Sequence, residues 1–242
     1  MTLQSLHCFA GIGGAALGFQ RGGIKPVEMC EIDPYCQRVL RRHWPHAGIH
    51  GDIRNLRKEH LSEHIDVITG GFPCQDISGA NWKAGGLEGH RSRLWYEQLR
   101  LVDEVKPSYV VAENSPFLRS RGLDVLLRGL DEVGYDAEWH CVPASHVGAP
   151  HQRDRIFIIA YPNGVGSQGQ GQLLNAVHPT PDAFGEADRL VDAVRTGSLP
   201  FVCRGHDGLP GGLERLKQLG NTVVPAIFES IARAIITREL LS

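Results

Sequence analysis

The sequence predicts an α/β fold in which a mostly parallel sheet is covered by helices on both faces. Short apolar segments bounded by Gly, Pro or Asp alternate with segments whose apolar residues have helical spacing. A glycine-rich turn joins the first apolar segment to a helical one, which is typical of this fold class. The length of 242 residues suits one main domain with a small appendage.

Five short apolar runs are the strand candidates, and each ends at a polar or turn-forming residue. They are Leu6–Ala10, Val27–Glu31, Ile65–Thr69, Tyr109–Glu113 and Arg155–Tyr161. Helices are predicted between them and at the end of the chain, because an Asp-Pro start opens the first and apolar residues recur at helical spacing in the others. These segments are Asp33–His43, Arg93–Val105 and the amphipathic Asn221–Leu241.

The composition changes after Pro162, where a stretch rich in Gly and Gln runs from Gly164 to Gln172. Such a shift is typical of a boundary. We therefore expect a main domain over residues 1–161, a short separate segment over 162–208, and a C-terminal segment over 209–242 that returns to the main domain.

Composition restricts the class of protein. Hydrophobic residues at 42% and charged residues at 21% are ordinary for a globular chain, so a disordered or fibrous protein is excluded. No apolar run approaches the length of a membrane span, and the first residues lack the pattern of a secretory signal, so we expect a cytoplasmic protein without a membrane partner. The net charge of −2 does not by itself indicate a nucleic-acid partner.

Six cysteines are present without a C-x-x-C spacing, so neither disulfides nor a metal site is expected. A free cysteine is usually a small buried apolar residue. We expect this of five of them, at positions 8, 30, 36, 141 and 203. Cys74 is the exception, because it follows the strand candidate Ile65–Thr69 in a loop rich in Gly and Pro, where a thiol is accessible.

The first glycine-rich turn indicates a cofactor that contains a nucleoside. Gly11, Gly13 and Ala16 satisfy the relaxed G-x-G-x-x-G/A pattern, and Glu31 lies at the distance expected of a carboxylate that binds ribose hydroxyls. The alternative is that the glycines only form a tight turn. Asp52 could reach an adenine amino group, but it could equally be a helix cap.

Two further polar features fall at the ends of strand candidates. Glu113 ends the run Tyr109–Glu113, where a carboxylate is costly unless it is solvated, paired or used. It could otherwise cap the next helix. Arg153 and Arg155 alternate at the start of the last strand candidate and can therefore point to one face, although such arginines usually form a solvated surface.

Together these blocks resemble the carbon-5 cytosine-specific DNA methyltransferases of bacteria and phages. The matching blocks occur in the family's order: Phe9–Gly14, Pro73–Gln75, Glu113–Asn114, Arg153–Arg155 and Gly220–Pro225. The resemblance implies a Rossmann-like fold of the S-adenosylmethionine-dependent methyltransferases, S-adenosylmethionine as cofactor and double-stranded DNA as partner. The sequence departs from the family at His151, where glutamine is common, and at Ser115, where valine is usual.

The resemblance also implies catalytic roles that fit the chemistry of each residue. Cys74 adds to ring carbon 6 of a flipped-out cytosine, and Glu113 donates a hydrogen bond to ring nitrogen 3. Arg155 holds the cytosine carbonyl oxygen, and Arg153 orients the thiolate and the carboxylate. The terminal helix is implied to pack beside the first strand.

The family's other contacts carry over residue by residue. The implied cofactor contacts are Phe9, Ala10, Gly11, Ile12, Gly13, Gly14, Glu31, Ile32, Asp52, Ile53, Pro73, Leu94, Asn221 and Thr222. The implied DNA contacts come from the catalytic loop and are Gln75, Ser78, Lys83, Arg91 and Arg93. A functional link to a restriction endonuclease and a monomeric state are further expectations.

The segment 162–208 corresponds to a small, reduced target-recognition segment. Residues 161–208 contain three arginines and five acidic residues, so their charge of −2 gives a poor grip on DNA. Two alternatives therefore stay open, a catalytically weak DNA-binding or regulatory relative and an RNA cytosine-5 methyltransferase. A nicotinamide oxidoreductase rests on the glycine pattern alone and leaves Cys74, Glu113 and Arg155 without a role.

Overall fold

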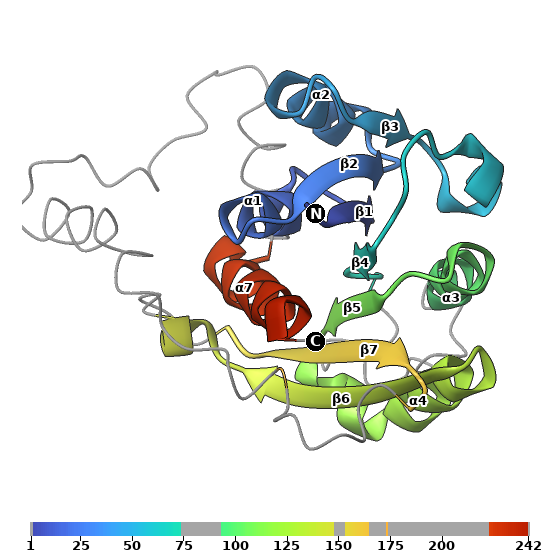
Figure 1. The fold of residues 1–242 in the computed structure, drawn as a ribbon, viewed down its shortest axis with the longest axis vertical. Coiled ribbons are helices and arrows are strands. Elements are labelled where there is room, and N and C mark those ends of the chain that lie inside the picture. The colour runs from blue at the N-terminus through green and yellow to red at the C-terminus, as the bar shows by residue number, and fades with distance from the viewer. Residues whose placement is uncertain (1, 74–92, 148–152, 165–172, 174–222, 242) are drawn as a thin grey trace, which may run out of the picture.

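A computed structural model describes residues 2–73, 93–147, 153–164, 173 and 223–241 (Figure 1). Its centre is a seven-stranded sheet in the order β3-β2-β1-β4-β5-β7-β6. The strands are β1 Gln4–Cys8, β2 Lys25–Cys30, β3 Gly48–His50, β4 Val67–Gly70, β5 Tyr109–Asn114, β6 Tyr135–Val142 and β7 Arg155–Pro162. The helices are α1 Gly14–Arg21, α2 Pro34–His43, α3 Leu94–Val105, α4 Leu123–Glu132 and α7 Pro225–Leu241.

The predicted α/β fold with a mostly parallel sheet is confirmed. Strands β1 to β5 pair in parallel, so their carboxyl ends meet at one edge of the sheet. β7 runs antiparallel to β5, and the register pairs Glu113 with Phe157 and Asn114 with Ile156. The start of β7, at Arg155, therefore lies at the same edge as the end of β5. β3, α4 and β6 are additions to the predicted elements.

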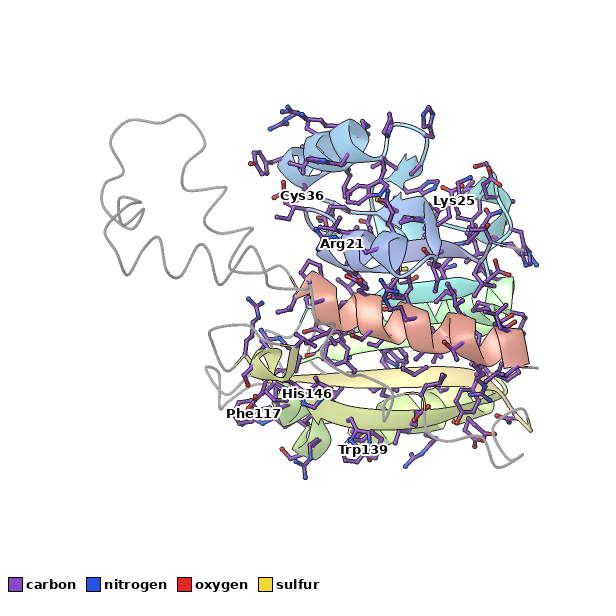
Figure 2. The ribbon with its side chains drawn as sticks, turned by 60° about the vertical axis from the view of Figure 1, so that its left-hand side comes forward. Arg21, Lys25, Cys36, Phe117, Trp139 and His146 are labelled. Atoms are coloured by element: carbon purple, nitrogen blue, oxygen red, sulfur yellow. The ribbon has the colours of Figure 1, made fainter. Side chains whose placement is uncertain are left out.

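Two apolar layers cover the sheet. On one face α3 and α4 contribute Leu101 and Leu126 to a cluster that includes Leu6 of β1. On the other face α1 and α7 contribute Phe19 and Ile231 to a second cluster, which covers β4, β5 and β7. Figure 2 shows α7 between α1 and the strands β7 and β6. None of the helices in the described ranges has the length and apolar character of a membrane span.

The C-terminal helix is buried around most of its circumference, rather than on one amphipathic face. It begins at Pro225, later than predicted, and packs closely against α1. Gly18 permits this approach, since a Cβ atom there would collide with the carbonyl oxygen of Pro225. The C-terminal helix thus packs beside α1, the helix that follows the first strand.

The cysteine expectations are confirmed in part. Cys8, Cys30 and Cys36 are buried thiols outside any disulfide. The expectation was wrong for Cys141, which is exposed because β6 is the last strand of the sheet and has no further neighbour. Cys203 lies outside the described residues.

A buried carboxylate joins the β2–β3 end of the sheet to the segment after it. Glu28 of β2 is buried, and one of its oxygens lies 2.7 Å from Nε2 of His50. Its other oxygen accepts hydrogen bonds from the backbone N–H and the hydroxyl of Ser62, at 2.9 and 2.7 Å. Burial raises the pKa of Glu28, but the hydrogen bonds from His50 and Ser62 outweigh it and leave the pKa below its usual value.

We expect Glu28→Gln to lower the free energy of unfolding by about 1–3 kcal/mol at pH 7. Because the pKa of Glu28 is lower in the folded than in the unfolded state, its ionised form stabilises the fold. This stabilisation is complete above the unfolded-state pKa, near 4.3, and is lost as the pH falls through the folded-state pKa. The variant should therefore lose stability less steeply in acid. Urea unfolding from pH 7 downward measures both effects, with exposed Glu59→Gln as control. If the free energy of unfolding fell in parallel with pH for Glu28→Gln and wild type, the lowered pKa assigned to Glu28 would be contradicted.

Candidate functional site

The loop between β1 and α1 is held in an unusual backbone conformation. Phe9, Gly11 and Gly13 all have positive φ angles, of 54°, 56° and 92°. Phe9 is the notable member, because residues with a side chain rarely adopt this region and such strain concentrates at functional sites. A Cβ atom at Gly13 would collide with the ring of Trp44, whereas the space beside Gly11 is open. The glycine pattern thus leaves room next to the backbone as well as forming a turn.

Glu31 follows β2 and is fixed against this loop. Its carboxylate accepts hydrogen bonds from the backbone N–H of Gly11 at 2.7 Å and from that of Asp33 at 2.8 Å. Asp33 in turn caps α2 by accepting from the N–H groups of Tyr35 and Cys36. The carboxylate is therefore held rigidly beside the glycine loop, with lone pairs left for a ligand.

A cavity of about 500 Å³ opens between the glycine loop, β2, the segment after β3 and the start of α3. This volume is typical of a small-molecule site. Its apolar walls include Ile32, which is 65% exposed, and its carboxylates are Glu31, Asp52 and Glu97. Seven of the expected cofactor residues line it: Phe9, Glu31, Ile32, Asp52, Ile53, Pro73 and Leu94. Apolar surfaces with nearby carboxylates fit a nucleoside, since the base needs flat apolar contacts and the ribose needs acceptors.

Two residues that line this cavity, Asp52 and Arg93, also stand at the starts of helical segments. Asp52 caps a 3₁₀ turn at Ile53–Asn55, accepts from the backbone N–H of Arg54 at 3.0 Å and pairs with its guanidinium. These hydrogen bonds from Arg54 hold the pKa of Asp52 below its usual value. Asp52 is therefore a helix cap, which was one of its two predicted roles, and it also lines the cavity. Arg93, which the resemblance places among the DNA contacts, immediately precedes α3 without a side-chain cap hydrogen bond, and it lines the same cavity.

A second, smaller cavity of about 80 Å³ lies beside the first, and Phe9 lines both. Ala10, Gly11 and Ile12 of the glycine loop also line it. The remaining lining residues come from β1, α1, the end of β4 and the residue after it, β5, and the C-terminal helix with the segment before it: His7, Cys8, Ala15, Thr69, Gly70, Gly71, Glu113, Val223 and Phe228. Glu31 thus lines the larger cavity and Glu113 the smaller one. Gly13 and Gly14 shape the turn without lining either cavity.

Glu113 is the next-to-last residue of β5, lines the smaller cavity and is 7% exposed. Its Oε1 lies 2.8 Å from Nε of Arg155, and Arg153 is a second nearby positive charge. Burial raises the pKa of Glu113, and this effect exceeds the opposite effect of the two arginines. Arg155 is thus a direct partner of the carboxylate, and the resemblance implies that Arg153 orients it.

The backbone that leads to Cys74 lies against Glu113. A Cβ atom on Gly71 would be 2.7 Å from Oε2 of Glu113. The side chain of Asn114 donates a hydrogen bond to the carbonyl oxygen of Phe72 at 3.0 Å, and its amide oxygen accepts from the N–H of Ser115 at 2.8 Å. The Glu-Asn pair therefore fixes the segment that immediately precedes Pro73 and Cys74.

Part of the expected site lies outside the described residues. These residues are Cys74, Gln75, Ser78, Lys83, Arg91, Asn221 and Thr222. The structure also adds residues that the sequence did not single out for a role, namely His7, Thr69 and the side chain of Asn114. Asn114 stands in one of the matching blocks, whereas His7 and Thr69 sit inside apolar strands and gave no signal.

Comparisons with known proteins agree with this site. Residues 3–195 match the family model described as C-5 cytosine-specific DNA methylase. A type II methyltransferase of Paramecium bursaria Chlorella virus IL3A is 38% identical over 161 residues, covering 66% of this chain and 43% of that protein. One from Psychrobacter sp. (strain TA137) is 34% identical over 200 residues, covering 80% and 46%. The chain therefore spans less than half the length of these relatives.

Solved structures give the same fold. A protein described as a DNA modification methyltransferase encoded within a prophage (E. coli) superposes with a TM-score of 0.61 at 26% identity, covering 76% of this chain and 54% of that one. A DNMT2 variant of Spodoptera frugiperda has a TM-score of 0.58 over 99% of this chain and 98% of its own, and at 13% identity it supports the fold alone. The fold is that of the Rossmann-like methyltransferases. With most of its length matched by the family model, the chain belongs to the C-5 cytosine-specific DNA methylases.

Proposed function

We propose that this protein transfers a methyl group from S-adenosylmethionine to carbon 5 of a cytosine in double-stranded DNA, through a covalent adduct with Cys74. One observation carries the proposal. Glu113 is a buried carboxyl group with a raised pKa, and it lies between Arg155 and the backbone segment that runs into Cys74. A carboxyl group with a raised pKa beside a cysteine loop is suited to donate the proton or hydrogen bond that addition to a pyrimidine ring requires.

The cavities fit the proposed cofactor. The larger one offers Ile32 and Ile53 as apolar contacts for a base and the fixed carboxylate of Glu31 as acceptor for the ribose hydroxyls. The smaller one is lined by Phe9 and Glu113 and is suited to the amino-acid part. When bound, S-adenosylmethionine supplies an electrophilic methyl group on a sulfonium. Asn221 and Thr222 are proposed to complete the contacts.

The residues of the chain supply the rest of the chemistry. Carbon 5 of cytosine is a weak nucleophile, so the Cys74 thiolate first forms a bond to carbon 6. Glu113 donates its proton, or a strong hydrogen bond, to ring nitrogen 3, which makes the addition feasible and leaves an enamine. Carbon 5 of this enamine would then take the methyl group from the sulfonium, and S-adenosylhomocysteine would leave. Arg155 stabilises negative charge on the carbonyl oxygen. Loss of the carbon-5 proton then breaks the bond between sulfur and carbon 6 and restores the aromatic ring.

The substrate base has to leave the duplex for this reaction. Rotating a nucleotide out of the stack costs a few kcal/mol, which contacts to the opened DNA must offset. We propose that Gln75, Ser78, Lys83, Arg91 and Arg93 make such contacts and that residues 162–208 form a small target-recognition segment. The acidic charge of that region favours a contribution from few residues rather than a broad basic surface.

The experiment is transfer of a labelled methyl group by the full chain, with plasmid DNA and transfer RNA as parallel substrates. We expect label in DNA, at carbon 5 of cytosine after hydrolysis to nucleosides. Label only in RNA would show that the substrate is RNA and not DNA. No label with either substrate would favour a DNA-binding protein without this activity, and a gel-shift assay would identify its binding to DNA. Bisulfite sequencing of the methylated plasmid would give the target sequence.

The proposal includes a biological setting. Its relatives are named type II methyltransferases, and we propose that this protein protects DNA against a restriction endonuclease with the same target, as a cytoplasmic monomer that forms no complex with the nuclease. Resistance of the methylated plasmid to a panel of endonucleases tests the first part. Sedimentation of the purified chain tests the second, and a stable dimer would contradict it.

A further inference from the structure

Two residues that line the smaller cavity each carry a buried polar atom with no hydrogen-bond partner among the described residues. The two atoms are Nδ1 of His7 and the hydroxyl oxygen of Thr69, and each side chain is 1% exposed. His7 of β1 pairs in register with Thr69 of β4, so both side chains point to the same face of the sheet. Buried polar groups nearly always have partners, and two such atoms on one cavity wall indicate a missing ligand.

The hydrogen bonds around His7 define what its free nitrogen can do. The hydroxyl of Ser5 has a single proton, which it donates to the carbonyl oxygen of Lys25 at 3.3 Å. With the Ser5 proton directed at Lys25, we assign the imidazole proton to Nε2, which then donates to the Ser5 oxygen at 2.9 Å. Nδ1 then carries a lone pair and can only accept a hydrogen bond.

The surroundings keep this imidazole neutral. The ring packs edge-on against Phe19 at 5.4 Å between centroids, and burial lowers the pKa of His7 to about 3. Nδ1 is thus an acceptor at physiological pH. An acceptor of this kind suits an ammonium group and cannot bind a carboxylate.

The position of the pair completes the argument. The smaller cavity shares Phe9 with the larger cavity and is also lined by Glu113. Its volume of about 80 Å³ exceeds the roughly 10–15 Å³ that one water molecule needs, so a larger polar group fits. Its lining includes Ala10, Gly11 and Ile12 of the glycine loop together with His7 and Thr69.

We propose that Nδ1 of His7 and the hydroxyl of Thr69 accept hydrogen bonds from the α-ammonium group in the amino-acid part of the cofactor. The inference rests on the proposed function and names a cofactor-binding role for two strand residues outside the glycine loop. The ammonium group supplies three donors, so it can satisfy both orphaned atoms at once.

Calorimetric titration of the full chain with two probes tests this role without the methylation reaction. The probes are S-adenosylhomocysteine and its analogue without the amino group. The wild type should bind the complete probe more tightly. His7→Leu should bind S-adenosylhomocysteine about tenfold to a hundredfold more weakly, with affinity for the analogue unchanged, because only the hydrogen bond to the charged donor is lost.

Further variants separate recognition from packing. His7→Asn keeps an acceptor near the position of Nδ1 and should retain the preference, while Thr69→Val should reduce it in part. Phe19→Leu removes the ring that packs on His7 and should leave the ratio of the two affinities as in the wild type. These variants keep the test open if His7→Leu fails to fold.

The outcomes are distinct. Equal weakening of both probes in His7→Leu, or an unchanged preference in His7→Leu and Thr69→Val, would overturn the role of the pair while leaving the proposed function intact. A wild type that binds neither probe would overturn the cofactor assignment and this inference with it.

Discussion

Replacement of Cys74 by alanine should abolish methyl transfer to DNA, a loss of more than about 10⁴-fold, because no other group can form the bond to carbon 6. Without that bond carbon 5 stays too electron-poor to accept a methyl group. Binding of DNA and of cofactor should remain, since neither depends on the thiolate. Single-turnover transfer of labelled methyl measures the effect on chemistry apart from product release.

The adduct itself can be detected. With DNA that contains 5-fluorocytosine, the carbon-5 proton is replaced by fluorine, so the last step is blocked and the protein stays bonded to the DNA on a denaturing gel. We expect this band for the wild type and for Cys141→Ala, which removes an exposed cysteine on β6. It should be missing for Cys74→Ala. A band of equal strength in Cys74→Ala would show that another nucleophile acts.

The fold was predictable where local patterns were strong. The glycine loop, the strands that bear Glu31 and Glu113, and the Asp33 cap of α2 all follow from short-range rules of turn and cap chemistry. β3 has only three residues, Gly48–His50, and is too short for a periodic signal. β6 is exposed at several positions because it ends the sheet, so its sequence does not read as a buried strand.

The site was predictable to the level of residues at strand ends, and not to the level of their partners. Arg153 and Arg155 are two positions apart and share a face, so only the register of β7 against β5 decides that Arg155 reaches Glu113. His7 and Thr69 are 62 positions apart, and their pairing depends on β1 and β4 being neighbours in the sheet. Such information depends on strand order, which local patterns do not contain.

Replacement of Glu113 by glutamine should lower the single-turnover rate by about 10²- to 10⁴-fold, the range for loss of a general acid. The amide keeps the size of the side chain and can still donate a hydrogen bond to ring nitrogen 3, but it cannot give up a proton. Affinity for cofactor should fall much less than the rate, because Glu31 and the larger cavity are unaffected and Glu113 only lines the smaller one. Glu132→Gln, on the exposed surface of α4, is the matched control.

The pH dependence distinguishes a proton donor from a residue that only shapes the pocket. Because burial raises the pKa of Glu113, the protonated form persists to higher pH than for an ordinary glutamate and is lost as the pH rises through that value. The wild-type rate should therefore fall on the alkaline side as this proton is lost, and Glu113→Gln should lack that fall at its lower rate. If both proteins lost activity in parallel as the pH rose, the titrating group would be another residue, and the buried position of Glu113 between Arg155 and Gly71 would be structural.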